Sequence, residues 1–294
     1  MIRIRACLLL PWFALAALAC SGKDEDPQQT PADLREWTML VEESWTLAGG
    51  SEAKDHCVKV PIEEDIYVSA IRPLSPKGTH HTFLALSDSA EGTRCTLAVA
   101  LGTMLYASGV GSEGIDLPEG VAIKLPAGKV LNLSLHLYNP ESAEISGKSG
   151  MEIVRVDPSQ VQHEAGTLLA GPVQLAIAPG RSTVTNECVI KKEQTAFNLF
   201  PHMHQLGVHF KTTVTQGGVS KVLHDGPYDF EEQAQLPIEP LQLVPGDTLT
   251  TECTFENPTP NVVKFGESSD TEMCFSVLFG FPGGGRTMCA FPGG

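Results

Sequence analysis

The sequence predicts an all-β protein made of two antiparallel β-sandwiches. Short segments alternate between apolar and polar residues, and turn signals separate them about every ten residues. The chain has 28 glycines and 21 prolines, and no helical period continues for more than about a dozen residues. Its 294 residues, 42% of them hydrophobic, are enough for two domains of ordinary size.

The clearest strands are residues 130–138 and 248–256. In the first, the leucines at 131, 133, 135 and 137 share one face, whereas Asn132, Ser134, His136 and Tyr138 share the other. In the second, residues 249, 251, 253 and 255 face inward. The leucine face must enter a core, so His136 is expected on the opposite, polar face.

Three further features complete the predicted architecture. Residues 208–222 contain two strands joined around Gly217-Gly218, which is a hairpin signal. Residues 31–43 are the best helix candidate. The glycine-bounded stretch 166–172 lies near the middle of the chain, and we place the domain boundary there, which gives domains 37–170 and 171–294.

The first 19 residues have the features of a secretion signal. Arg3 and Arg5 precede a short apolar run that ends in small residues before Cys20. The ending Ala17-Leu-Ala-Cys20 resembles a bacterial lipobox, which implies lipidation of Cys20; ordinary cleavage with a free cysteine is the alternative. Residues 20–36 are then a lipidated terminus and flexible tether.

The charge of the chain argues against nucleic-acid binding. The formal net charge is −15, and it becomes 18 − 35 = −17 when the two leader arginines leave. Nucleic-acid binders carry a basic face, which this balance disfavours. We expect an exported monomer, anchored by lipid to the cell envelope and, with Ser21 after Cys20, to the outer membrane.

Six cysteines remain after the leader and the lipidated position are set aside: Cys57, Cys95, Cys188, Cys253, Cys274 and Cys289. An even number in an oxidising compartment indicates three disulfides, for which 15 pairings are possible. A metal–thiolate site is the rival interpretation. The chain has no Cys-x-x-Cys pair to support it.

Five histidines and one methionine are candidate metal ligands. His202 and His204 are two residues apart in a strand and therefore share a face. The adjacent His80 and His81 diverge on a regular strand, so they can share a metal only where the backbone is irregular. Each pair alone has a structural explanation, and Met273 beside a cysteine is most often core. A thioether ligand makes sense for a soft metal, above all Cu(I).

The combination resembles the copper type II, ascorbate-dependent monooxygenases. The resemblance covers roughly residues 40–294 and rests on five motifs in order. They are Thr79-His-His-Thr-Phe-Leu84, Leu135-His-Leu-Tyr-Asn139, Pro201-His-Met-His-Gln-Leu-Gly207, the string Gly246-Asp-x-Leu-x-Thr-x-Cys253, and Glu272-Met-Cys274.

The resemblance implies two jelly-roll sandwiches that face each other across a cleft, with one copper each. His80, His81 and His136 would hold an electron-storing copper, and His202, His204 and Met273 an oxygen-binding copper. The implied disulfides are Cys57–Cys95, Cys188–Cys289 and Cys253–Cys274, which use all six cysteines. The implied reaction hydroxylates a substrate C–H bond with O2 and a small reductant such as ascorbate.

The substrate pocket departs from the family pattern. Positions that hold a peptide carboxylate in the amidating members are Phe200 and Val277 here, with Phe275 between Met273 and Val277. These side chains cannot grip a carboxylate, so we expect an apolar or aromatic substrate; ordinary core packing is the alternative for Phe200 and Phe275.

Three rival functions remain open at this point. A copper carrier or sensor on the envelope would use the same ligands without turnover. A cupin-like iron dioxygenase normally has a glutamate shortly after His-x-His, and residues 205–209 contain none. A structural lipoprotein would keep the six ligands only as relics.

Overall fold

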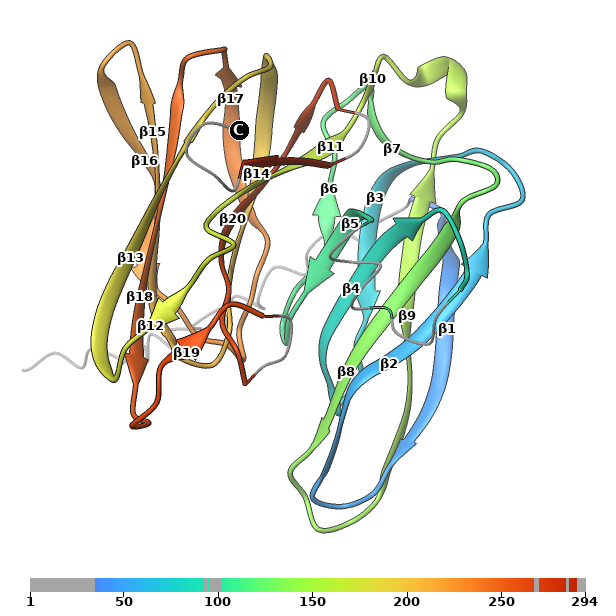
Figure 1. Ribbon diagram of the computed structural model, residues 1–294. Helices are drawn as coiled ribbons and strands as arrows, with labels where there is room; N and C mark the ends of the chain where they lie inside the picture. The colour runs from blue at the N-terminus through green and yellow to red at the C-terminus, as the bar shows by residue number, and fades with distance from the viewer. Residues whose placement is uncertain (1–34, 92–94, 96–101, 267–269, 284–285, 290–294) are drawn as a thin grey trace, which may run out of the picture. The chain divides into compact units, whose positions relative to one another are not determined.

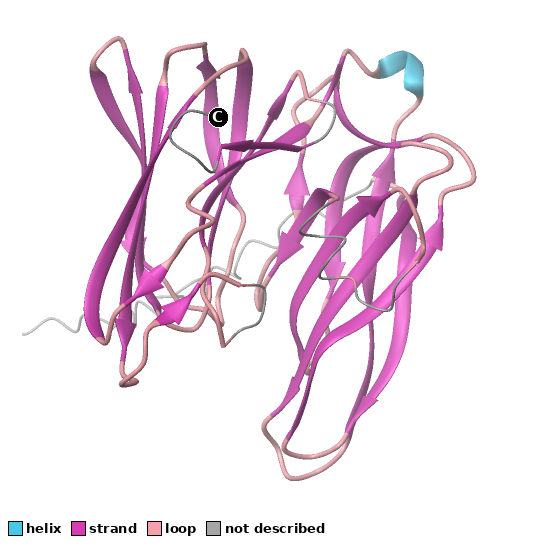
Figure 2. Ribbon diagram, in the orientation of Figure 1, coloured by secondary structure: helices cyan, strands magenta, loops and turns pink. Residues whose placement is uncertain are grey.

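The structure is a computed structural model that describes residues 35–91, 95, 102–266, 270–283 and 286–289. The expected secretion signal, the lipidated Cys20 and residues 21–34 of the tether lie outside the described residues. Residues 36–294 form one compact unit. Its described part is built of strands, with a single 3-10 turn, η1 (Pro158–Gln160), as Figure 2 shows. The all-β prediction is therefore confirmed.

No helix among the described residues has the length and apolar character needed to cross a membrane.

The first half of the chain forms two sheets (Figure 1). One has the order β1-β9-β3-β7-β10, with β6 beside β3, and the other has the order β2-β8-β4-β5. Their strands are β1 (Trp37–Leu47), β2 (Ser51–Pro61), β3 (Ile66–Leu74), β4 (Thr79–Ser87), β5 (Thr103–Ser108), β6 (Ile115–Asp116), β7 (Val121–Leu125), β8 (Val130–Asn139), β9 (Ile145–Arg155) and β10 (His163–Glu164). Buried side chains from both sheets share one core, so the sheets pack face to face.

Strand β8 shows how the sequence pattern positions a candidate ligand. Its four leucines are buried in the core between the sheets, as the period of two predicts. The opposite face is less exposed to solvent than expected, because Asn132 and Ser134 are also buried. His136 on that face keeps some exposure, and Tyr138 is exposed. The solvent exposure of this face of β8 therefore increases along the strand, from Asn132 towards Tyr138.

The helix expected over residues 31–43 is wrong in the part that the structure describes. Residues 37–47 form β1, which pairs antiparallel with β9 from Trp37 opposite Val154 to Leu47 opposite Ile145. Val41, Trp45 and Leu47 are buried at even spacing, which is the strand period. The Trp45 indole also donates to Ser149 Oγ at 2.7 Å, which ties β1 to its neighbour.

The second half contains sheets of order β17-β14-β20-β11-β21 and β13-β18-β15-β16, and a small sheet β12-β19. Their strands are β11 (Gly166–Ala170), β12 (Ala176–Ile177), β13 (Gly180–Val189), β14 (Gln194–Met203), β15 (Gly207–Gln216), β16 (Val219–Pro227), β17 (Leu236–Leu243), β18 (Thr248–Asn257), β19 (Val263–Lys264), β20 (Cys274–Phe281) and β21 (Arg286–Cys289). A second core lies between the two larger sheets.

The two remaining strand predictions are confirmed in this half. β15 and β16 form the hairpin expected around Gly217-Gly218, and both glycines have positive φ, at 56° and 82°. Two positive φ values suit the tight turn that follows the right-handed twist of a hairpin. In β18, residues 249, 251, 253 and 255 are all buried, as their alternation predicts.

The chain passes from the first half to the second at Ala165. β10 pairs with β7, whereas β11, directly after Ala165, pairs with β20 and β21. Residue 170, where the boundary was expected, is the last residue of β11, a strand that pairs within the second half. The largest core also takes in Phe197 and Phe279 of the second half, so apolar packing joins the halves there.

Three disulfides cross-link the described residues: Cys57–Cys95, Cys188–Cys289 and Cys253–Cys274. They are the three pairs that the family resemblance implies. Each bond lies within one half of the chain. The bond from Cys188 in β13 to Cys289 in β21 connects the two larger sheets of the second half.

Candidate metal centres

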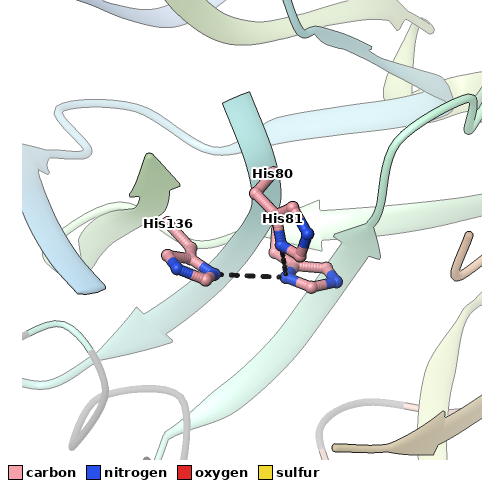
Figure 3. Close-up of side chains that lie close together, drawn as sticks. All are labelled: His80, His81 and His136. Carbon is pink, nitrogen blue, oxygen red and sulfur yellow. Dashed lines mark hydrogen bonds between the residues drawn. The ribbon is translucent and has the colours of Figure 1, made fainter. Parts of the chain in front are cut away.

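The first candidate centre is formed where β4 and β8 lie side by side. His81 lies directly opposite His136 in the antiparallel register, and the register shifts between Thr79 and His81. That irregularity lets the adjacent His80 and His81 turn to the same side, which a regular strand would prevent. Figure 3 shows the three rings gathered at one point.

The imidazole Nδ1 atoms converge at this centre. His80 Nδ1 and His81 Nδ1 are 2.8 Å apart, and His81 Nδ1 lies 3.4 Å from His136 Nδ1 (Figure 3). These are three potential metal ligands within a space the size of one coordination sphere.

Each Nε2 atom, by contrast, faces an acceptor outside the cluster. His80 Nε2 is 2.7 Å from Glu231 Oε2, and His136 Nε2 is 2.6 Å from Glu52 Oε1. His81 Nε2 is 2.9 Å from the Phe230 carbonyl oxygen, which can only accept. A neutral imidazole has one N–H, and a proton on Nε2 satisfies each of these acceptors. His81 Nε2 also lies 3.0 Å from the Gln233 amide nitrogen.

In this tautomer, the three Nδ1 lone pairs point at one another. Such an arrangement calls for a cation, and three imidazoles suit copper or zinc. Histidine ligands commonly donate their other N–H to a carboxylate or carbonyl, which fixes the tautomer and the ring orientation. Burial lowers the pKa of His81 well below its ordinary value, helped by the charges of His80 and His136. Burial also lowers the pKa of His136, so the neutral ligand form is favoured.

The second candidate centre lies at the end of β14. His202 and His204 are both buried, with ring centroids 5.2 Å apart. His204 Nδ1 donates to the Thr271 carbonyl at 2.8 Å, and His202 Nδ1 is 2.9 Å from Gln233 Oε1. Both rings therefore carry their proton on Nδ1, which makes Nε2 the candidate ligand atom, the reverse of the first centre. Burial, together with the charge of His204, lowers the pKa of His202 to about 3.

The segment that carries Met273 is joined to the same place. β14 pairs with β20 so that Met203 lies opposite Cys274. His204 is the residue directly after β14, and Met273 is the residue directly before β20. The carboxylate of Glu272 accepts the backbone N–H of His204 at 2.9 Å and that of Met273 at 3.3 Å. It also accepts the N–H of Leu206 at 2.6 Å. One carboxylate thus fixes the backbone of both the histidine and the methionine segments.

Burial shapes the electrostatics around this carboxylate. It raises the pKa of Glu272 to about 7, although the three N–H groups act in the opposite direction. The Tyr228 phenol clamps the residue between the two histidines, because it donates to the Met203 carbonyl at 2.6 Å and accepts the Met203 N–H at 2.9 Å.

The three pocket candidates are core residues in their surroundings. Phe200, Phe275 and Val277 are all buried and belong to the largest core. The Phe200 ring stacks on His202 with centroids 5.9 Å apart, and the Phe83 ring meets His202 edge-on at the same distance. The wall beside His202 is therefore aromatic.

Sequence reasoning missed the residues that contact the histidine rings or the backbone beside them: Glu52, Tyr228, Phe230, Glu231, Gln233 and Glu272. Only Glu272, beside Met273 in a quoted motif, left a signal in the sequence.

Comparison with known proteins agrees with this geometry. Residues 163–292 match the C-terminal domain of the copper type II ascorbate-dependent monooxygenases. Peptidyl-glycine alpha-amidating monooxygenase A of Xenopus laevis is 26% identical over 233 residues, which cover 74% of this chain and 25% of that protein. Residues 163–292 are thus similar to the C-terminal domain of this monooxygenase family, and the relatives extend the similarity to most of the chain.

Two other relatives share the name DBH-like monooxygenase protein 1. The Mus musculus protein is 28% identical over 216 residues, which cover 64% of this chain and 34% of the relative. The Homo sapiens protein is 26% identical over 280 residues, which cover 79% and 44%. The chain thus spans between 25% and 44% of the length of these three relatives.

Proposed function

We propose that this protein hydroxylates a substrate C–H bond with O2 and a small reductant such as ascorbate, using two copper ions. The observation that carries the proposal is the first centre, where three Nδ1 lone pairs converge while every Nε2 has an outside acceptor. The neutral, preoriented imidazoles fit copper. Copper would supply the one-electron redox chemistry and the binding of O2.

The two centres differ in softness, and this difference assigns their roles. His80, His81 and His136 offer three imidazoles, which serve both oxidation states of copper and suit an electron store. His202 and His204 with Met273 would add a thioether, which favours Cu(I), the state that meets O2. Glu272 holds the two ligand segments together by its contacts with His204 and Met273.

The aromatic wall supports an apolar or aromatic substrate. Phe83 and Phe200 flank His202, and no basic side chain accompanies them in these ring contacts. Phe200, Phe275 and Val277 would then be the pocket residues, with Phe200 nearest to a ligand ring. An apolar substrate needs no charged partner beside these rings. A carboxylate beside them would lose its hydration without gaining a cation in these ring contacts.

The leader and the architecture complete the proposal. The basic start, apolar run and Ala17-Leu-Ala-Cys20 ending support export and lipidation at Cys20, with anchoring to the cell envelope as a monomer. The face-to-face sheets in each half support two jelly-roll sandwiches with one copper each, separated near the expected boundary at residue 170.

The test replaces the proposed soft ligand. Met273→Ile should lower copper stoichiometry from two ions per chain to one and abolish ascorbate-driven O2 uptake, because isoleucine keeps the apolar volume but has no sulfur. Met39→Ile, at an exposed methionine of β1, is the matched control and should keep both. Uptake is measured with a panel of small aromatic and aliphatic compounds, against copper-free protein.

Two results would overturn the proposal. Full turnover in Met273→Ile would show that the assigned oxygen site is wrong. Two bound coppers with no O2 uptake above the free-copper background would instead support the copper carrier.

A further inference from the structure

One short segment of the second half contacts histidines of both candidate centres. Residues 229–235 connect β16 to β17. The Phe230 carbonyl accepts from His81, and the Glu231 carboxylate lies 2.7 Å from His80 Nε2. The same segment presents Gln233 to His202. The outer contacts of the two centres are therefore not independent.

Gln233 is the residue of this segment that touches both centres. Its side chain is buried, with 2% of the residue exposed. Its Oε1 lies 2.9 Å from His202 Nδ1, whereas its Nε2 lies 3.2 Å from the Phe230 carbonyl and 3.0 Å from His81 Nε2. A single amide thus spans from one histidine cluster to the other.

The chemistry of these neighbours decides which way the amide points. The Phe230 carbonyl has no proton, so the amide nitrogen must face it and the amide oxygen must face His202. The oxygen then takes the proton on His202 Nδ1 and leaves Nε2 unprotonated. Turned by half a rotation, the amide would offer N–H to His202 Nδ1 and favour the tautomer whose Nε2 carries the proton and cannot bind a metal.

The backbone of Gln233 is held as firmly as its side chain. Its carbonyl accepts the Gly109 N–H at 3.0 Å and the Ser112 hydroxyl at 2.8 Å. A Cβ at Gly109 would lie 2.9 Å from the Gln233 nitrogen, so the close approach needs glycine at 109. The amide therefore has little freedom except rotation about its own terminal bond.

We propose that Gln233 is a positioning residue for the second metal centre, an inference that rests on the proposed function. The Phe230 carbonyl accepts from the Gln233 amide nitrogen, and this contact turns the amide oxygen towards His202 Nδ1. The His202 proton then stays on Nδ1, and Nε2 is the atom that can bind copper.

The first test needs no metal. Nitrogen-15 NMR of the copper-free protein should show His202 with its proton on Nδ1, and Gln233→Leu should convert that signal to a mixture of tautomers. Gln235→Leu is the matched control, because Gln235 lies in the same segment but donates to the Ala107 carbonyl at 2.8 Å. An unchanged His202 signal in Gln233→Leu would overturn the inference.

The second test measures metal binding. The Cu(I) affinity of the second centre is determined against a chromophoric chelator in the parent protein, in Gln233→Leu and in Gln235→Leu. We expect Gln233→Leu to lower that affinity by about 10- to 100-fold, and Gln235→Leu to leave it near that of the parent protein.

The possible failures are distinguishable. Protein that binds no copper overturns the proposed function, while the NMR result still decides the role of Gln233. Two copper centres of unchanged Cu(I) affinity in Gln233→Leu would overturn the role of Gln233 and leave the proposed function standing.

Discussion

At the scale of the single residue, the orientation of each histidine ring follows from what its second nitrogen contacts. Glu52, the Phe230 carbonyl and Glu231 are hydrogen-bond acceptors for the Nε2 atoms of the first cluster, so Nδ1 is the candidate ligand atom. The Thr271 carbonyl accepts a hydrogen bond from His204 Nδ1, so Nε2 is the candidate ligand atom of this ring. Nδ1 lies nearer the main chain than Nε2, so the first centre depends more directly on backbone geometry.

Glu272 should matter for stability as well as for metal binding. Glu272→Ala removes the acceptor of three backbone N–H groups, at His204, Leu206 and Met273. We expect the free energy of unfolding to fall by about 3 kcal/mol. Copper affinity at the second centre should fall by about 10- to 100-fold. Urea unfolding and copper titration measure the two effects.

The exposed Glu239 offers a control for that change, because Glu239→Ala removes a carboxylate of β17 at the surface. It should leave both measurements near those of the parent protein. Loss of first-centre copper in Glu272→Ala would contradict the local role assigned to this carboxylate.

The sequence was sufficient to nominate the ring-bearing residues but not their partners. His136 could be placed opposite a leucine face because β8 alternates strictly. Gln233 and Glu231 could not, because they lie in a connecting segment without periodicity and act about 150 residues away, with separations of 152 and 151 residues from His81 and His80. Such contacts depend on tertiary structure alone.

At the scale of the element, β1 shows which of two local signals prevails. Residues 31–43 were the best helix candidate of the chain, but burial at Val41, Trp45 and Leu47 follows the strand period. Pairing with β9 along almost its whole length satisfies the backbone groups of β1. Tertiary pairing therefore decides the structure of this segment.

The β15–β16 hairpin contains a histidine that should make stability depend on pH. Burial lowers the pKa of His224, partly offset by Asp225, so the folded state binds fewer protons than the unfolded state as the pH falls below 6.5. The free energy of unfolding should therefore decrease on acidification. His224→Gln should remove part of that decrease.

Guanidinium unfolding of both proteins at pH 7.5 and pH 5.5 would check this expectation. The free energy of unfolding of His224→Gln, relative to that of the parent protein, should be higher at pH 5.5 than at pH 7.5. A difference that is the same at both pH values would show that His224 does not contribute to the acid dependence.

At the scale of the whole molecule, the second half is held by a long-range covalent link. Cys188–Cys289 closes a separation of 101 residues, compared with 38 for Cys57–Cys95. Replacing both partners, Cys188→Ala with Cys289→Ala, should lower the free energy of unfolding by about 4 kcal/mol through the unfolded state. The corresponding double change at 57 and 95 should cost less, because its loop is shorter.

Denaturant unfolding of the two double variants would test this order. The copper stoichiometry of the Cys188/Cys289 variant serves as a check that the native fold is retained. The opposite order of stabilities would show that local packing around Cys95, and not loop length, dominates.

The relation between the two halves is the part of the fold that sequence could least predict. Alternation along a strand identifies an inward face but does not reveal which other sheet covers it. Phe197 and Phe279 are apolar strand residues of the second half, yet they belong to the core that also holds the leucines of β8. That shared packing was not expected from two domains read separately.

The Glu231 and Phe230 contacts carry one more consequence. The first histidine cluster is assembled by β4 and β8, but two of its three proton acceptors come from the other half of the chain. A hybrid that joins one half of this chain to the other half of a distant relative should therefore have misoriented imidazoles. The hybrid would keep the ring orientation only if residues 229–235 and β4 came from the same protein. The orientation of the imidazoles in the first centre is therefore a property of both halves together.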